Sequence, residues 1–192
     1  ELAMPEYAKF IVDRGVAALV FDYRCLGKSD GEPRQHLDPW MQISDYRSAI
    51  DAVSYLNEYE GLLDPERIGV WGISYSGGHS LIVGAIDWRV KCIVSHIPII
   101  DGWYNSMRDH GTVGFRELTA LVDEERRNRY LTGEHGTIPH SGDPKKEVVT
   151  WPHPETKPIF MKIKETVAPN HEHFSTIASV EGVWNYNVLP FL

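Results

Sequence analysis

The sequence has few cysteines, no long apolar run and no excess of basic residues. Two cysteines in 192 residues form no disulfide framework, which favours a reducing, cytoplasmic location. No apolar run approaches the ~20 residues of a membrane-spanning helix, so no membrane association is predicted. The net charge of −8 argues against nucleic acid and anionic lipid as partners. What remains, 42% hydrophobic and 24% charged residues, is the composition of an ordinary globular domain.

Helical and strand-like apolar patterns alternate through the first half of the chain. The expected order is helix 3–14, strand 16–21, helix 38–59, strand 68–71, helix 79–86 and strand 90–95. The strands are short continuous apolar runs, as in a sheet that is covered on both faces. Cys92 lies in the last of these runs and is predicted to be buried. The alternation predicts an α/β fold in which helices flank a parallel sheet.

The second half of the chain has a different pattern. We expect a helix over 115–130, with a solvated, charged second half, and a long loop over 132–158 that is rich in proline and glycine. We therefore divide the chain into a core portion, 1–100, and a mainly helical and loop cap, 101–192. Four aromatic residues of the cap either line an apolar acyl pocket or pack as ordinary core: Trp103, Tyr104, Trp151 and Trp184.

The stretch that carries chemistry joins the strand at 68–71 to the following helix. Ser74 stands two residues after Gly72 and is followed by Ser76, Gly77 and Gly78. A serine nucleophile on a tight strand-to-helix turn needs small neighbours, because larger ones would bring strand and helix into collision. The glycines meet this need, so Ser74 is the candidate nucleophile.

The same stretch has other possible interpretations. The usual motif has glycine two residues after the serine, whereas this chain has Ser76 there, and a shifted frame would make Ser76 the nucleophile. No lysine follows the glycines, which excludes a Walker-type phosphate loop, and Gly69 and Gly72 have the wrong spacing for a dinucleotide fingerprint. No cofactor is therefore predicted.

Two motifs together resemble a known superfamily. They are Phe21-Asp22-Tyr23-Arg24-x-x-Gly27-x-Ser29-x-Gly31 and Gly72-x-Ser74-Tyr75-x-Gly77. The chain resembles the α/β-hydrolases, within them the esterase-like hydrolases that include fungal polyketide transferases and thiohydrolases, and more distantly the cocaine-esterase and X-prolyl peptidase group. The likeness covers 1–100 clearly. Cys25 stands where many relatives have glycine.

The resemblance implies roles for residues inside and outside the chain. The backbone N–H of Tyr75 would supply half of the oxyanion hole, and the second donor is expected before Glu1. Because the triad order is serine, acid and histidine, the acid and histidine are expected beyond Leu192. The resemblance thus implies that the chain is an internal part of a longer hydrolase.

Some residues within the chain are weaker candidates for the triad. Asp101 follows the strand at 90–95 at the right edge of the sheet, where it is either an acid or, as we favour, a hinge residue of the cap. His96, His110 and His173 are the histidines to consider if the triad is complete within these residues.

Histidines are common metal ligands, so their spacing bears on a possible metal site. His171 and His173 have metal-like spacing, but on an expected helix start two residues this far apart point to different faces. Three others, His135, His140 and His153, lie in an expected loop, and no third ligand is positioned by pattern, so no metal site is predicted.

The sequence thus predicts a serine hydrolase that acts on a small-molecule ester, thioester or related acyl substrate through Ser74. Two alternatives stay open: a peptidase of the X-prolyl or prolyl-oligopeptidase-like kind, and a non-catalytic binding module built on a hydrolase scaffold.

Overall fold

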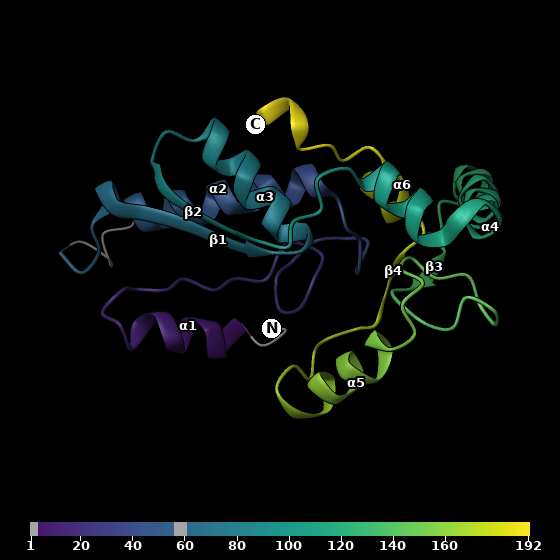
Figure 1. Cartoon of the computed structure of the whole chain (residues 1–192), viewed down its shortest axis with the longest axis horizontal. Coiled ribbons are helices and arrows are strands. Elements are labelled where there is room, and N and C mark those ends of the chain that lie inside the picture. Colours follow the sequence, from purple (N-terminus) through teal and green to yellow (C-terminus); the bar gives the residue numbers. More distant parts are fainter. Residues whose placement is uncertain (1–3, 56–60) are drawn as a thin grey trace. The chain divides into compact units, whose positions relative to one another are not determined.

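The computed structural model describes residues 4–55 and 61–192 (Figure 1). The chain divides into two compact units. One unit comprises Glu1–Asp38 and Trp103–Asn185, and the other comprises Pro39–Gly102 and Tyr186–Leu192. The division into a core and a cap at residue 100 stays a prediction.

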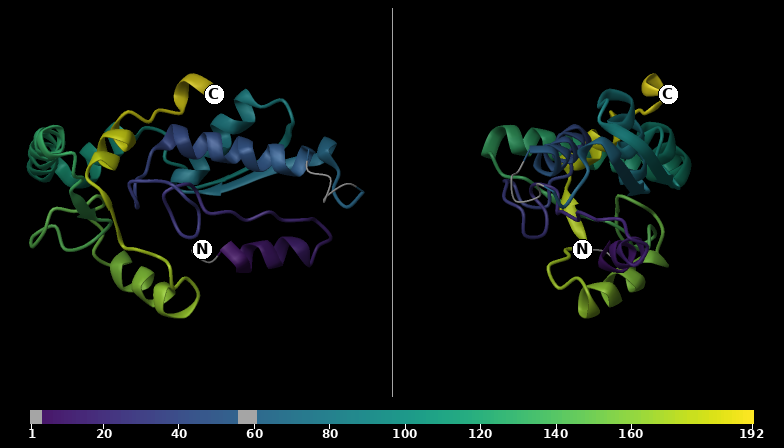
Figure 2. Two further views of the ribbon diagram at one scale, coloured as in Figure 1. Left: turned by 180° about the vertical axis from the view of Figure 1, so that it is seen from behind. Right: turned by 90° about the vertical axis from the view of Figure 1, so that its left-hand side faces the viewer.

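The second unit contains the predicted parallel strands. Strand β1 (Ile68–Ile73) pairs in parallel with β2 (Val90–His96), and Ile73 stands opposite His96 in the register. Helix α3 (Tyr75–Ile86) connects them and packs on both strands, and α2 (Pro39–Tyr55) lies alongside α3 (Figures 1 and 2). The strand–helix–strand order predicted from the sequence is confirmed.

Helices α2 and α3 bury apolar side chains against each other and the sheet. Ile43 and Ile50 of α2 are buried, as are Ile82 and Val83 of α3. Burial of such side chains stabilises the folded state by roughly 1.5–3 kcal/mol each. Trp40, in the first turn of α2, is 45% exposed. The predicted end of this helix at residue 59 lies outside the described residues.

A charged network ties α2 to the turn between α3 and β2. Asp87 ends α3, and its carboxylate accepts hydrogen bonds from the guanidinium groups of Arg89 at 2.8–2.9 Å and of Arg47 at 3.3 Å. Arg89 also donates to Asp51 of α2 at 2.7 Å. Hydrogen bonds from Arg89 lower the pKa of Asp87 to about 2. The Asp87 side chain is 2% exposed, so this ionised carboxylate depends on its arginine partners.

The first unit is mainly helical. It contains α1 (Met4–Val12), α4 (Gly102–Thr132), α5 (Thr156–Thr166) and α6 (Ala178–Trp184), and a short antiparallel pair of β3 (Thr137–Pro139) with β4 (Phe174–Thr176). A cluster of apolar side chains from α4, β3 and α6 forms its core: Leu118, Val122, Ile138, Ile177 and Val180. None of the helices that the structure describes combines the length and the hydropathy of a membrane span.

The N-terminal segment joins this unit through residues 35–37. The backbone carbonyl of Gln35 accepts from Thr176 N–H at 3.0 Å, and Leu37 N–H donates to Ser179 Oγ at 2.8 Å. His36 Nδ1 lies 2.8 Å from Thr176 Oγ1. These bonds attach residues that are distant in sequence to the β4–α6 segment.

Two expectations about local structure are wrong. Residues 16–21 form no strand, and Val16, Leu19 and Val20 are exposed. Among the described residues no other strand hydrogen-bonds to this run, and β-propensity without a partner does not make a strand. Cys92 is exposed, whereas Cys25 is buried.

The expected loop over 132–158 is also only partly a loop. It contains β3 and the start of α5, because β3 finds its partner in β4 some way further along the chain. The predicted helix over 115–130 lies within α4, where Gly111 interrupts the helical backbone with φ 63°. The loop 22–31 is compact: Cys25 adopts φ 67°, and its N–H donates to Asp30 O at 2.8 Å. A non-glycine residue there takes the left-handed conformation that a glycine would adopt freely.

Candidate active site

Ser74 occupies the single residue between β1 and α3. Its backbone has φ 56° and ψ −115°, which is rare for a residue with a side chain, and the residue is exposed. Strained backbone of this kind costs of order 1–3 kcal/mol and persists only where the surroundings impose it. The predicted position of Ser74, on a strained turn between strand and helix, is confirmed.

Backbone hydrogen bonds hold Ser74 in this conformation. Its N–H donates to the carbonyl of His96 at the end of β2, at 2.9 Å. Its own carbonyl accepts from Ile99 N–H at 3.0 Å and from Gly78 N–H at 3.3 Å. Strand β2 and the residues after it therefore fix the turn from one side, and α3 fixes it from the other.

The glycines around Ser74 are required by close packing. A Cβ atom on Gly72 would overlap the carbonyl group of Ser76, and one on Gly78 would overlap the carbonyl of Ile99. On Gly77, a Cβ would lie 3.0 Å from the His96 carbonyl oxygen. The steric reason given for the sequence motif thus holds at each position.

Helix α3 begins directly after Ser74. Tyr75 is the first residue of the helix, and the first N–H groups of an α-helix have no acceptor within the helix itself. They also carry the positive end of the helix dipole. This position suits an N–H that stabilises a developing oxyanion, which is the role expected for Tyr75.

A buried polar network lies behind the turn, and sequence reasoning did not identify it. His79 of α3 is fully buried, with Nδ1 2.9 Å from Tyr186 Oη and Nε2 2.8 Å from Gln42 Oε1. The Tyr75 ring packs against both His79 and Tyr186, at 4.6 and 5.0 Å between ring centroids. Burial lowers the pKa of His79 to about 3, so its imidazole is neutral.

The tautomer of His79 follows from its partners. Gln42 Oε1 can only accept, so Nε2 carries the proton, and Tyr186 Oη donates to Nδ1. The network packs the first turn of α3 against the end of the chain at Tyr186. A histidine inside an apolar helix was the one available signal in the sequence, and by itself it indicates no partner.

Asp101 has the contacts of a structural residue. It forms an antiparallel bridge with Asn187, whose side-chain amide donates to Asp101 Oδ2 at 3.3 Å. Next to it, Gly102 N–H donates to Tyr186 O at 2.9 Å. These bonds favour the hinge interpretation, and a catalytic part for Asp101 stays a prediction.

The candidate histidines lie in different environments. His96 ends β2 and is exposed, and its carbonyl holds Ser74. The ring of His110 donates from Nε2 to Thr150 O at 3.0 Å, and Nε2 of His173 lies 3.0 Å from Ser141 Oγ. Among the described residues of the unit that contains Ser74, its hydroxyl forms no hydrogen bond with His79 or His96.

The expectation that His171 and His173 point to different faces is wrong. They lie in the connection before β4 rather than on a helix, and ring nitrogens of both converge with one of His140.

Among the aromatic candidates, Trp103 and Trp184 pack on each other and on Phe115, which supports the packing interpretation for these two.

The chain is similar to enzymes and to a solved hydrolase structure. The quorum-quenching protein AidA of Acinetobacter baumannii is 40% identical over 106 residues, which are 55% of this chain and 34% of that protein. The thiohydrolase aneE of Aspergillus aculeatus is 40% identical over 124 residues, 64% of this chain and 38% of that protein. The chain therefore spans little more than a third of the length of these curated relatives.

The structural likeness covers nearly the whole chain. The α/β-hydrolase GrgF of Penicillium sp. sh18 superposes with a TM-score of 0.73 and 22% identity, over 98% of this chain and 61% of the other. At this identity the likeness establishes the fold. The family is established by residues 2–149, which match the family described as X-Pro dipeptidyl-peptidase (S15 family). Both findings confirm the resemblance inferred from the motifs: the chain belongs to the X-Pro dipeptidyl-peptidase (S15) family of α/β-hydrolases.

Proposed function

We propose that the protein containing this chain is a serine hydrolase that cleaves an ester, thioester or related acyl bond, with Ser74 as its nucleophile. The observation that carries the proposal is the backbone of Ser74, with φ 56° on an exposed turn between β1 and α3. Strain at an exposed serine, held by several backbone hydrogen bonds, is a feature of nucleophile elbows.

The proposed reaction has two stages. Ser74 Oγ attacks the acyl carbon, a histidine expected beyond Leu192 takes the hydroxyl proton, and the carbonyl π electrons move to its oxygen. The tetrahedral intermediate collapses, and the leaving alcohol or thiol takes the proton from the histidine. Water then attacks the acyl-enzyme with the same histidine as base, which releases the acid and restores the Ser74 hydroxyl.

The start of α3 suits the stabilisation of charge in this reaction. The Tyr75 N–H would donate to the oxyanion of the intermediate, and the helix dipole adds to the attraction. Removing one such donor in other hydrolases typically costs about 10²–10³-fold in kcat. Close packing at the glycines and the His79 network would restrain the first turn of α3 and so keep this N–H in position.

The relatives support an acyl substrate of small size. One is named a thiohydrolase and another a quorum-quenching protein. The alternative of a peptidase is favoured by one observation, the match to a family described by its X-Pro dipeptidyl-peptidase activity. Both alternatives use the same nucleophile, and they differ in the leaving group.

The experiment is covalent labelling of the whole protein with a fluorophosphonate probe. Labelling is expected in the unsubstituted protein and in Ser76→Ala, and it should be lost in Ser74→Ala. Ser76→Ala is the matched control, because it removes a hydroxyl two residues away from the same turn. Labelling that persists in Ser74→Ala would refute the assignment, and a protein that never labels would support a non-catalytic binding module.

A substrate panel then separates the two enzyme classes. Activated esters and thioesters are compared with an X-Pro anilide at equal concentration. Turnover of the esters or thioesters alone supports the proposal. Turnover that is larger with the anilide would favour the peptidase.

A further inference from the structure

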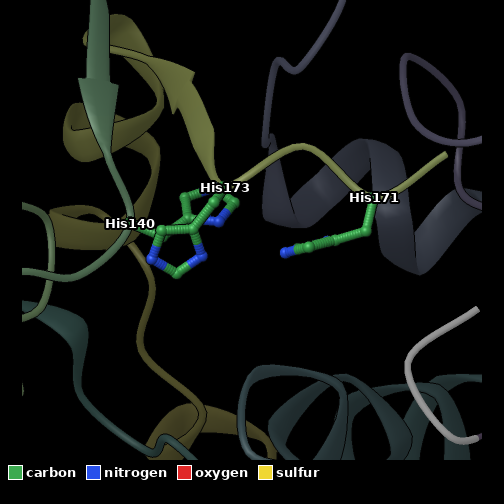
Figure 3. Close-up of side chains that lie close together, drawn as sticks. All are labelled: His140, His171 and His173. Carbon is green, nitrogen blue, oxygen red and sulfur yellow. The ribbon is translucent and has the colours of Figure 1, made fainter. Parts of the chain in front are cut away.

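Three histidines of the first unit bring their side chains together. His140 follows β3, and His171 and His173 lie in the connection between α5 and β4. Figure 3 shows the rings of His140 and His173 next to each other, with the ring of His171 directed toward them. One ring nitrogen from each residue lies within 4.8 Å of the other two.

The antiparallel ladder fixes two of these residues. Pro139 pairs with Phe174, so the next residue on β3 meets the preceding residue on β4. His140 N–H indeed donates to His173 O at 3.0 Å. The backbone therefore holds His140 opposite His173, and their ring centroids are 5.6 Å apart. His171 completes the group from two residues earlier, with ring centroids 5.9 and 6.3 Å from those of His173 and His140.

A hydrogen-bonded pair orients the ring of His173. Its Nε2 lies 3.0 Å from the hydroxyl of Ser141, which is buried, and 3.3 Å from the carbonyl of the same residue. Thr156 Oγ1 in turn donates to Ser141 Oγ at 2.8 Å. The N–H of Ser141 also donates to Nε2, at 3.3 Å, so Ser141 offers this nitrogen both a donor and acceptors. Coordination of a metal ion by Nδ1 would place the ring proton on Nε2, where the hydroxyl and carbonyl oxygens of Ser141 can accept it. Partners of this kind, beyond the ligands themselves, orient the imidazole rings of metal sites.

Two of the ring nitrogens in the cluster are buried and lack a partner. These are Nε2 of His140 and Nδ1 of His173, which have no hydrogen bond to any described residue. Buried polar atoms are nearly always satisfied, so each such atom calls for an explanation. An ion bound among the three histidines would account for both of these unpartnered nitrogens at once.

Burial favours the neutral imidazoles of His140 and His173. Burial, together with the neighbouring His173 and His171, lowers the pKa of His140 to about 3. Burial also lowers the pKa of His173. Aromatic rings complete the environment, since Trp151 packs on His140 and Phe160 packs on both other histidines. Neutral imidazoles have the lone pairs that metal binding requires.

We propose that His140, His171 and His173 bind a divalent transition metal ion, with Zn²⁺ as the best match. Three imidazole nitrogens suit zinc, copper or nickel, whereas magnesium and calcium take oxygen ligands. In a tetrahedral zinc site with Zn–N bonds of about 2.0–2.1 Å, the ligand nitrogens lie ~3.3 Å apart. Rotation of the side chains supplies the contraction from the present separation, and water occupies the fourth position.

The acidic residue between two of the histidines is already engaged. Glu172, between the two histidines of the connection, accepts from Lys164 Nζ of α5 at 3.0 Å. The ligand set is therefore all imidazole. A metal ion at this position would link the end of β3 to the α5–β4 connection. Without it, these two segments are joined by the pairing of β3 with β4, which have three residues each. The site accordingly has a structural function, and it is independent of the chemistry proposed for Ser74.

The test is metal binding by the whole protein after removal of metal with a chelator. We expect one equivalent of Zn²⁺ to bind in calorimetry, and Co²⁺ to give the visible absorption of a tetrahedral site that Zn²⁺ abolishes. His140→Ala, His171→Ala and His173→Ala should each lower the affinity at least ~100-fold, and Ser141→Ala should lower it about 10–100-fold. His135→Ala, an exposed histidine of the same unit, is the matched control and should bind as the unsubstituted protein does.

Several outcomes would overturn the proposal. They are no binding by the unsubstituted protein, and equal affinity in the ligand variants and the control. If a ligand variant fails to fold, as judged by circular dichroism, X-ray absorption of the zinc-loaded unsubstituted protein decides. Three imidazole nitrogens around the metal support the site, and sulfur or carboxylate ligation refutes it. Labelling by a fluorophosphonate probe serves as a separate readout and is expected to be the same with and without zinc.

Discussion

The carbonyl group of Ser76 occupies the space that a methyl group on Gly72 would fill. This contact lies across the turn that exposes Ser74, and both partners are backbone. Neither can move by changing a side-chain rotamer, so the absence of a side chain at position 72 is a condition for the turn.

Substitution Gly72→Ala should therefore disrupt the turn. We expect a loss of about 1–3 kcal/mol in the free energy of unfolding, as for other overpacked sites, together with loss of labelling at Ser74. Urea unfolding and fluorophosphonate labelling measure the two effects. Gly114→Ala is the control: an added Cβ there lies 3.4 Å from the nearest atom, in helix α4, and stability should be unchanged or higher. Equal stability of Gly72→Ala and the unsubstituted protein would contradict the steric account.

Turnover should separate the two serines of the turn. In the full-length enzyme, Ser74→Ala is expected to lower kcat for an activated ester by about 10⁴–10⁶-fold, because no other hydroxyl can form the acyl-enzyme. Ser76→Ala should change kcat less than ~10-fold, since it removes no reacting atom. Steady-state kinetics on both variants provide the measurement. Similar losses in the two variants would show that the hydroxyl of Ser74 has no special part.

The buried His79 should make stability depend on pH. Its pKa is lowered by burial from 6.5 to about 3, so between these values the unfolded chain binds one more proton than the folded chain. Stability should therefore fall as the pH drops below about 6.5, by up to ~1.4 kcal/mol per pH unit from this residue. Unfolding free energies at several pH values, in the unsubstituted protein and in His79→Gln, measure the contribution as the difference in slope. Identical slopes would mean that His79 is not buried in its neutral form.

Removal of the Asp87 carboxylate should lower the free energy of unfolding, because its arginine partners would lose their anionic partner. Asp87→Asn keeps the shape of the side chain but leaves Arg89, whose side chain is 11% exposed, with only Asp51 as an anionic partner. We expect a loss of about 3 kcal/mol in the free energy of unfolding, measured in urea. Asp64→Asn removes an exposed pair with Arg67 and should leave stability almost unchanged. If both variants lose the same amount, the burial of the network contributes nothing.

The elbow could be predicted because its determinants are contiguous. An apolar run, a serine between small residues and a second apolar run specify strand, turn and helix within β1 and α3. The positive φ of Ser74 follows from the same local pattern. The parallel pairing of β2 with β1 follows too, since a helix that connects two buried strands returns the chain in the same direction.

Contacts between distant segments could not be predicted in this way. Strands β3 and β4 have three residues each, which is too short for a periodic signal, and they are separated by α5. The meeting of His140 with His173 depends on their register. The partners of His79 come from Gln42 and Tyr186, which no local pattern connects. The run at 16–21 shows the opposite case, in which a clear local pattern has no partner among the described residues.

The bonds between residues 35–37 and the β4–α6 segment also bear on how such a chain can diverge. A change of side chain at Thr176 or Ser179 alters the hydrogen-bond partners of His36 and Leu37, although about 140 positions separate the two segments. Transfer of 103–185 from one homologue to another would therefore separate a matched pair of sequences, unless 35–37 came with it. Recombination between the two segments would leave residues 35–37 of one homologue against the β4–α6 segment of another and could remove these hydrogen bonds. The two segments are therefore expected to be inherited together.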